Sequence, residues 1–148
     1  MSYMKIVLMA KSGPIVIVED DLDDQNILDE AIRESGTKNE IIFFSTGPSA
    51  FEFLKQTKSQ PFLILSDINL PVQTGIEFKK RIDEDPELRQ KSIPFIFFST
   101  SVEKSAVTKA YTEMTVQGFF KKSNTYDELK SVIRLIMDYW KLCKHPNT

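Results

Sequence analysis

The chain of 148 residues has the length of one domain, and 41% hydrophobic with 27% charged residues is the composition of a globular protein. A formal net charge of -2 without a basic stripe argues against nucleic-acid binding. The single cysteine, Cys143, excludes an intramolecular disulfide. No apolar run approaches the roughly 20 residues that span a bilayer, and no signal-peptide cleavage pattern follows the start. These features predict a cytoplasmic protein without a membrane segment.

The first part of the chain predicts two strands, each followed by a helix. The apolar run 15–18 predicts a strand, and a helix with its apolar face at 27–32 follows and ends at Gly36. The run 41–44 predicts the second strand. Pro48 then occupies a first-turn position of the second helix.

The middle of the chain repeats this order twice. The run 62–65 predicts the third strand, and a capping-box pattern at Thr74 and Glu77 opens the third helix. The run 95–98 predicts the fourth strand, and apolar positions within 107–114 predict the fourth helix.

The last part predicts a strand at 118–120 and the longest helix, opened by a second capping-box pattern at Thr125 and Glu128. Five strands alternating with five helices predict a parallel sheet with helices on both faces. The continuous apolar runs are typical of strands covered on both sides. We expect one domain over 14–148, preceded by an N-terminal extension, 1–13.

The carboxyl ends of the strands in such a sheet are where ligands bind. Polar residues follow four of the five predicted strands. They are Glu19, Asp20 and Asp21 after the first, Ser66 and Asp67 after the third, Ser99, Thr100 and Ser101 after the fourth, and Lys121 and Lys122 after the fifth. The topology therefore predicts that carboxylates, hydroxyls and a lysine converge on one edge.

Clustered carboxylates need a cation, because two of them about 5 Å apart repel by roughly 3 kcal/mol at an effective dielectric near 20. Oxygen ligands favour Mg²⁺, and Mg²⁺ with a lysine neutralises a transferring phosphoryl group. A carboxylate is also a competent nucleophile. Each acidic residue alone is as well explained as a helix cap on a solvated rim. The combination of carboxylates, hydroxyls and a lysine at four strand ends predicts phosphoryl transfer to an aspartate.

The segments IVIVEDD, LSDINLPVQTG, IPFIFFSTS and GFFKK resemble the receiver domain of two-component response regulators, the CheY-like family. The resemblance covers nearly the whole chain. It implies a flavodoxin-like, doubly wound α/β fold with a five-stranded parallel sheet in the order 2-1-3-4-5.

The resemblance also implies roles for individual residues. Asp67 would be the phosphoacceptor, and Ser99 and Lys122 would be its catalytic partners. The ligands of Mg²⁺ would be Asp20, Asp67, the backbone carbonyl of Asn69 and, through water, Glu19. Ser99 and Phe119 would form the switch, and Asn69 and Ser101 occupy positions that tune hydrolysis of the phosphoryl group.

Two features depart from the family pattern. Two lysines compete for the family lysine, and aligning Gly118-Phe119 with the usual glycine–aromatic pair selects Lys122 over Lys121. Ser123 replaces the usual proline that follows this lysine through a cis bond. A cis bond before a non-proline residue costs about 2.5–4 kcal/mol, so we expect a trans bond.

The ending DYWKLCKHPN resembles small response regulators without an output domain, including those paired with bacterial phytochrome kinases. This implies a sensor histidine kinase as phosphodonor, which a phytochrome-type kinase would fit. With no DNA-binding segment following, the output would be a protein target or a phosphotransfer protein. Whether this C-terminal segment contributes to a homodimer stays open. Cys143 and His145 are expected to lie on a polar tail without function.

The sequence predicts a phosphorylated signalling protein that is not an enzyme in the ordinary sense, and three alternatives fit it less well. The first is a receiver-fold binding module that is never phosphorylated. The presence of an acidic residue at every acidic position of the family pattern argues against it. The second is a haloacid-dehalogenase-type phosphatase, which needs a second aspartate where this chain has Asn69. The third, an FMN site, lacks a hydroxyl-rich phosphate loop after the first strand.

Overall fold

The computed structural model describes residues 11–100 and 103–145. Most of the expected N-terminal extension, 1–13, and the position of Ser101 lie outside the described residues. The boundary between extension and domain at residue 14 therefore remains a prediction.

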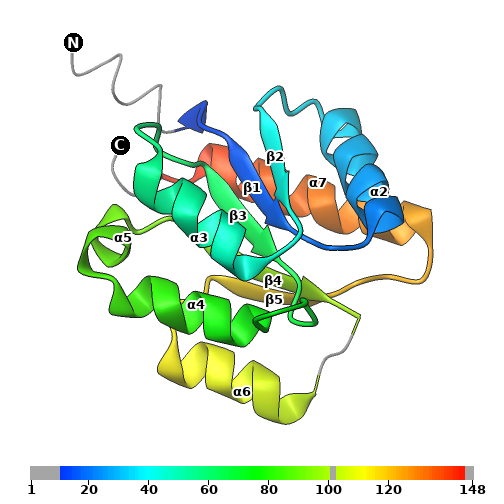
Figure 1. Ribbon diagram of the computed structural model, residues 1–148. Helices are drawn as coiled ribbons and strands as arrows, with labels where there is room; N and C mark the ends of the chain where they lie inside the picture. Colours follow the sequence, from blue (N-terminus) through cyan, green and yellow to red (C-terminus); the bar gives the residue numbers. More distant parts are fainter. Residues whose placement is uncertain (1–10, 101–102, 146–148) are drawn as a thin grey trace, which may run out of the picture.

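Five parallel strands form one sheet in the order β2-β1-β3-β4-β5, as expected (Figure 1). The strands are β1 (Ile15–Val18), β2 (Ile41–Phe44), β3 (Leu63–Ser66), β4 (Phe95–Ser99) and β5 (Gly118–Lys121). The register places Val18 beside Ser66, and Ser99 beside Lys121. The residues that follow β1, β3, β4 and β5 therefore leave the sheet at the same edge.

Six helices are described, one more than the sequence predicted. They are α2 (Leu22–Glu34), α3 (Gly47–Gln56), α4 (Gly75–Glu84), α5 (Pro86–Lys91), α6 (Lys104–Glu113) and α7 (Tyr126–Leu142). The unexpected one, α5, begins with Pro86 directly after the cap residue Asp85, whose side chain accepts from Leu88 N. Its six residues are too short for the periodic apolar pattern on which the prediction relied.

The caps that the sequence indicated are largely present. Thr74 and Glu77 make both bonds of a capping box at the start of α4. Thr125 accepts from Glu128 N at the start of α7, and Pro48 lies in the first turn of α3. Gly36 follows α2 with a φ of +85°, a left-handed conformation that favours glycine.

The sheet separates two apolar cores. One lies between the sheet and α2 with α7, and the other between the sheet and α3, α4, α5 and α6 (Figure 1). The three inner strands are fully buried, but β2 is half-buried along its length and β5 is exposed at Phe120 and Lys121. The two edge strands have a neighbour on one side only, so they are less completely buried than their continuous apolar runs indicated.

The end of the chain also differs from the expectation of a polar tail. His145 is 1% exposed, its ring stacks on Phe62 with centroids 5.6 Å apart, and its Nε2 lies 2.7 Å from the Phe62 carbonyl oxygen. Cys143 is half-buried. The chain after α7 thus packs against the start of β3, which the sequence pattern alone did not indicate.

Candidate functional site

Asp67 lies directly after β3, where its backbone N–H donates to Val18 O at 3.0 Å. Its side chain is 10% exposed. Oδ1 accepts three hydrogen bonds, from Ser99 Oγ at 2.8 Å, Ile68 N at 2.7 Å and Asn69 N at 3.2 Å. Oδ2 accepts from Lys122 Nζ at 3.1 Å. One oxygen is therefore held by fixed donors, and the other faces a single flexible side chain.

These donors keep Asp67 ionised. Burial on its own would raise the pKa of Asp67, but the hydrogen bond from Ser99 and the charge of Lys122 outweigh it. The net result is a pKa below the ordinary value of 3.8. Asp67 is therefore a carboxylate at neutral pH despite its burial.

Glu19 follows β1 and is 2% exposed. Lys122 Nζ donates to its Oε1, whereas Oε2 is buried and has no hydrogen-bond partner among the described residues. Burial raises the pKa of Glu19 to about 8, a shift that the bond from Lys122 only partly offsets. A buried carboxyl oxygen without a partner in this position is suited to a cation or to a water bound to one.

Lys122 follows β5, and its backbone N–H donates to Ser99 O at 2.8 Å. Its ammonium lies among the carboxylates, whereas Lys121 is exposed, so the structure brings the expected one of the two lysines into the cluster. Burial alone would lower the pKa of Lys122, but the bond to Glu19 and the charge of Asp67 raise it overall. All peptide bonds between described residues are trans, which confirms the expectation for Lys122–Ser123.

Of the other expected site residues, Ser99 bonds to Asp67, whereas the side chains of Asp20, Asn69 and Phe119 lie outside the cluster. The Asp20 side chain is exposed, and the structure gives it no hydrogen bond or ion pair with a described residue. Asn69 is exposed in the loop after β3. Phe119 is half-buried, and its ring centroid is 5.5 Å from that of Phe97. Ser99 is fully buried and already directed at Asp67.

No group of three or more acidic, histidine or cysteine side chains within 11–100 and 103–145 has the arrangement of a metal cluster. In the structure the Lys122 ammonium, rather than a gap, lies between Glu19 and Asp67. The lysine thus supplies the positive charge that offsets these two acidic side chains in the structure.

Asp24 was missed by the sequence reasoning. It lies in the first turn of α2, and its Oδ2 is 3.2 Å from Lys122 Nζ. The acidic residues Asp23 and Asp24 look alike in the sequence, and both suit a helix N-terminus. Only the packing of α2 beside the end of β5 distinguishes them.

The loop between β3 and α4 is fixed by Gly75. Its N–H donates to Ile68 O at 2.8 Å, and a Cβ at this position would lie 2.1 Å from Asp67 O. The start of α4 therefore packs directly against the backbone that carries Asp67, which is why a glycine is needed there.

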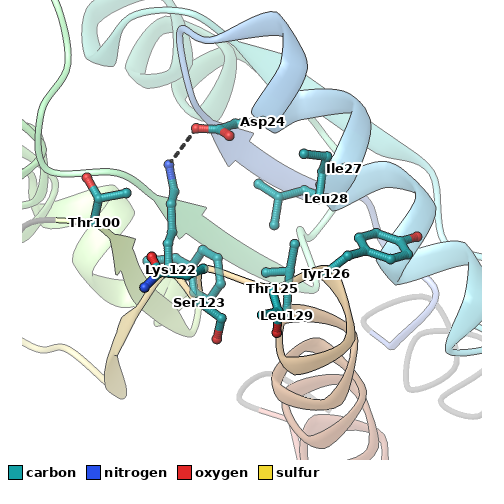
Figure 2. A pocket seen from close by; sticks show the side chains of 11 residues that line it. Asp24, Ile27, Leu28, Thr100, Lys122, Ser123, Thr125, Tyr126 and Leu129 are labelled. Carbon is teal, nitrogen blue, oxygen red and sulfur yellow. Dashed lines mark hydrogen bonds and ion pairs between the residues drawn. The ribbon is translucent and has the colours of Figure 1, made fainter.

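Next to the cluster is a pocket of about 160 Å³ between α2 and the start of α7 (Figure 2). Its lining includes Asp24, Thr100, Lys122 and Tyr126. Figure 2 shows the Lys122 side chain extended with its Nζ directed at the Asp24 carboxylate. The pocket thus connects the acidic cluster with the surface of α2.

Known proteins resemble this chain over most of its length. The family model of the response regulator receiver domain matches residues 15–134. Response regulator Rcp1 of Synechocystis sp. is 31% identical over 131 residues, which cover 85% of this chain and 87% of Rcp1. No helix in the described part is long and apolar enough to cross a membrane.

Solved structures show the same likeness. The phosphorylated cyanobacterial phytochrome response regulator RcpA has a TM-score of 0.79 and 30% identity, covering 87% of this chain and 94% of RcpA. The Mn²⁺-bound form of Rcp1 has a TM-score of 0.79 and 29% identity, covering 90% of this chain and 98% of Rcp1.

Proposed function

The chain belongs to the response regulator receiver domain family, and we propose that Asp67 is the side chain on which it accepts a phosphoryl group. One observation carries this proposal: Asp67 is a buried, ionised carboxylate with one oxygen held by three donors and the other facing a lysine. The donor would be the phosphohistidine of a sensor histidine kinase.

The two oxygens of Asp67 suggest how the transfer proceeds. Oδ1 is engaged by Ser99 and two backbone N–H groups, so Oδ2 retains the lone pairs for attack. A bond forms between Oδ2 and phosphorus, the phosphorus–nitrogen bond to histidine breaks, and its electron pair stays on the imidazole nitrogen. The fixed donors on Oδ1 hold the nucleophile in one orientation.

Lys122 and Ser99 are positioned to bind the product. Lys122 Nζ is 3.1 Å from Oδ2 and can follow the new phosphoryl oxygens with a small movement. The Ser99 hydroxyl, 2.8 Å from Oδ1, can donate to the same group. Both place positive charge or a donor where negative charge gathers, so we propose that the protein assists both its own phosphorylation and its dephosphorylation.

The acidic edge fits Mg²⁺, as the unpartnered Glu19 Oε2 and the exposed Asp20 carboxylate both supply oxygen ligands. We propose that Asp20, Asp67 and the Asn69 carbonyl hold the ion and that Glu19 contributes through water. When bound, the ion neutralises charge on the transferring phosphoryl group. The Mn²⁺-bound form of the relative Rcp1 supports this assignment.

The relatives also suggest the signalling context. RcpA is a phytochrome response regulator, so a phytochrome-type sensor kinase is the proposed donor, acting in the cytoplasm. Phosphorylation would be read through Ser99 and Phe119 at the surface of β5 and α6. The output would be contact with a protein target or a phosphotransfer protein, and a second copy of the chain is a further candidate partner.

Intact-mass measurement tests the assignment. With Mg²⁺ and acetyl phosphate, the wild type should gain one phosphoryl group and Asp67→Asn should gain none. Asp23→Asn is the matched control, because it removes an exposed carboxylate of the same edge and should be labelled normally. Labelling of Asp67→Asn at the wild-type level, or an unlabelled wild type, would contradict the proposal.

A further inference from the structure

Lys122 has one more partner than phosphoryl transfer to Asp67 requires. Its Nζ lies 3.1 Å from Asp67 Oδ2 and 3.2 Å from Asp24 Oδ2, and it also donates to Glu19 Oε1. An ammonium has three N–H donors, so three carboxylates occupy all of them. A phosphoryl group on Asp67 Oδ2 can take over the donor that Oδ2 holds now, but any second bond from Lys122 to that group requires Glu19 or Asp24 to release a donor.

The exposure of the carboxylates decides which one gives way. The Glu19 side chain is 3% exposed, and its other oxygen is already without a partner, so losing Lys122 would leave both buried oxygens without a hydrogen bond. The Asp24 side chain is 40% exposed, and water can replace the ammonium there. Asp24 is therefore the partner that is least costly to release.

The position of Asp24 is fixed by the fold. The side chain of the cap residue Asp21 accepts from Asp24 N at 3.0 Å, which fixes the first turn of α2. The Asp24 carboxylate then faces Lys122 across the edge of the pocket in Figure 2. Asp23, its neighbour in the same turn, is exposed, and the structure gives it no contact with Lys122.

We propose that Asp24 is a positioning residue that acts through Lys122, holding its ammonium in the unphosphorylated protein and competing for it with the phosphoryl group on Asp67. The inference rests on the proposed function and adds to it a residue outside the acceptor and its metal ligands. Removing the Asp24 charge should stabilise the phosphorylated form relative to the free one.

Beryllium trifluoride, which binds a carboxylate oxygen with the shape of a phosphoryl group, measures this balance at equilibrium. Calorimetric titration in the presence of Mg²⁺ should show Asp24→Asn binding it roughly two- to tenfold more tightly than the wild type, the range expected for one partly exposed ion pair. Asp23→Asn, which changes the net charge equally, should bind like the wild type. Asp24→Glu keeps the charge, and its affinity for beryllium trifluoride should lie between those of the wild type and Asp24→Asn.

A second readout needs neither metal nor phosphoryl group. In ¹⁵N NMR spectra of the metal-free protein, the Lys122 ammonium signal should shift in Asp24→Asn and stay in place in Asp23→Asn. A merely structural role for Asp24 would not change this signal selectively.

The outcomes separate this inference from the proposed function. If beryllium trifluoride binds Asp24→Asn no more tightly than Asp23→Asn, or the Lys122 signal does not move, the competition is refuted while Asp67 remains the acceptor. If the wild type binds no beryllium trifluoride and gains no phosphoryl group, the proposed function itself fails, and the inference with it.

Discussion

Substitution of Gly75 by alanine tests how strictly the packing of α4 positions Asp67. The added Cβ would lie 2.1 Å from Asp67 O, 3.0 Å from Asp67 C and 2.9 Å from the Ile68 Cα. An ordinary contact needs more than 3 Å, so the backbones must separate by about 1 Å, and no flexible side chain can absorb the overlap. The bond from Gly75 N to Ile68 O joins the same two segments.

The expected result is a large loss of phosphorylation. A misplacement of about 1 Å in a reacting group can cost on the order of 100-fold in rate, and overpacking typically costs about 1–3 kcal/mol of stability or somewhat more. The rate is measured by intact mass with acetyl phosphate, well below the unfolding temperature. Gly36→Ala is the control, because its φ of +85° costs about 1–2 kcal/mol but its Cβ meets no atom within 4 Å. A wild-type rate in Gly75→Ala would refute this reasoning.

Two further predictions concern a buried ion pair remote from the site. Lys79, 3% exposed, donates to Asp83 at 2.8 Å and Thr115 Oγ1 at 2.9 Å. Lys79→Ala should lower the free energy of unfolding, measured by urea titration, by about 3–5 kcal/mol. The double variant with Asp83→Ala should lose less than the sum of the two single losses, and additive losses would contradict the pairing. Burial alone would raise the pKa of Asp83, but bonds from Lys79 and Thr115 lower it below the ordinary value of 3.8. The ionised Asp83 carboxylate therefore stabilises the folded protein above pH 3.8, and this contribution is lost as the pH falls through the lower pKa of the folded state. Asp83→Asn should therefore be less stable than wild type at neutral pH and approach it in acid, and a constant difference down to the acid limit would argue against the shift.

The sheet could be predicted from the sequence because its signals are local. Each strand is a short continuous apolar run, and each main helix carries a cap or an apolar face, as at Thr74 and Thr125. The alternation of these elements leaves few topologies. The short helix α5 was not predicted because six residues are too few to show an apolar periodicity. The Asp85-Pro86 pair was its only signal in the sequence.

The site could be predicted in part. Three of the site residues directly follow strands, namely Glu19, Asp67 and Lys122, and Ser99 is the last residue of β4. The parallel topology brings these strand ends together. Asp24 lies inside a helix, so its contact with Lys122 depends on how α2 packs. His145 likewise depends on where the chain goes after α7. Long-range packing of this kind has no local sequence signal.

The position of the phosphoryl group tests the central claim most directly. Borohydride reduces an aspartyl phosphate to homoserine, so wild-type protein treated with acetyl phosphate and Mg²⁺, then reduced and digested, can be sequenced by mass spectrometry. The account predicts homoserine at position 67 and nowhere else. Homoserine at position 20 or 24, or phosphorylation that leaves residue 67 an aspartate, would contradict it.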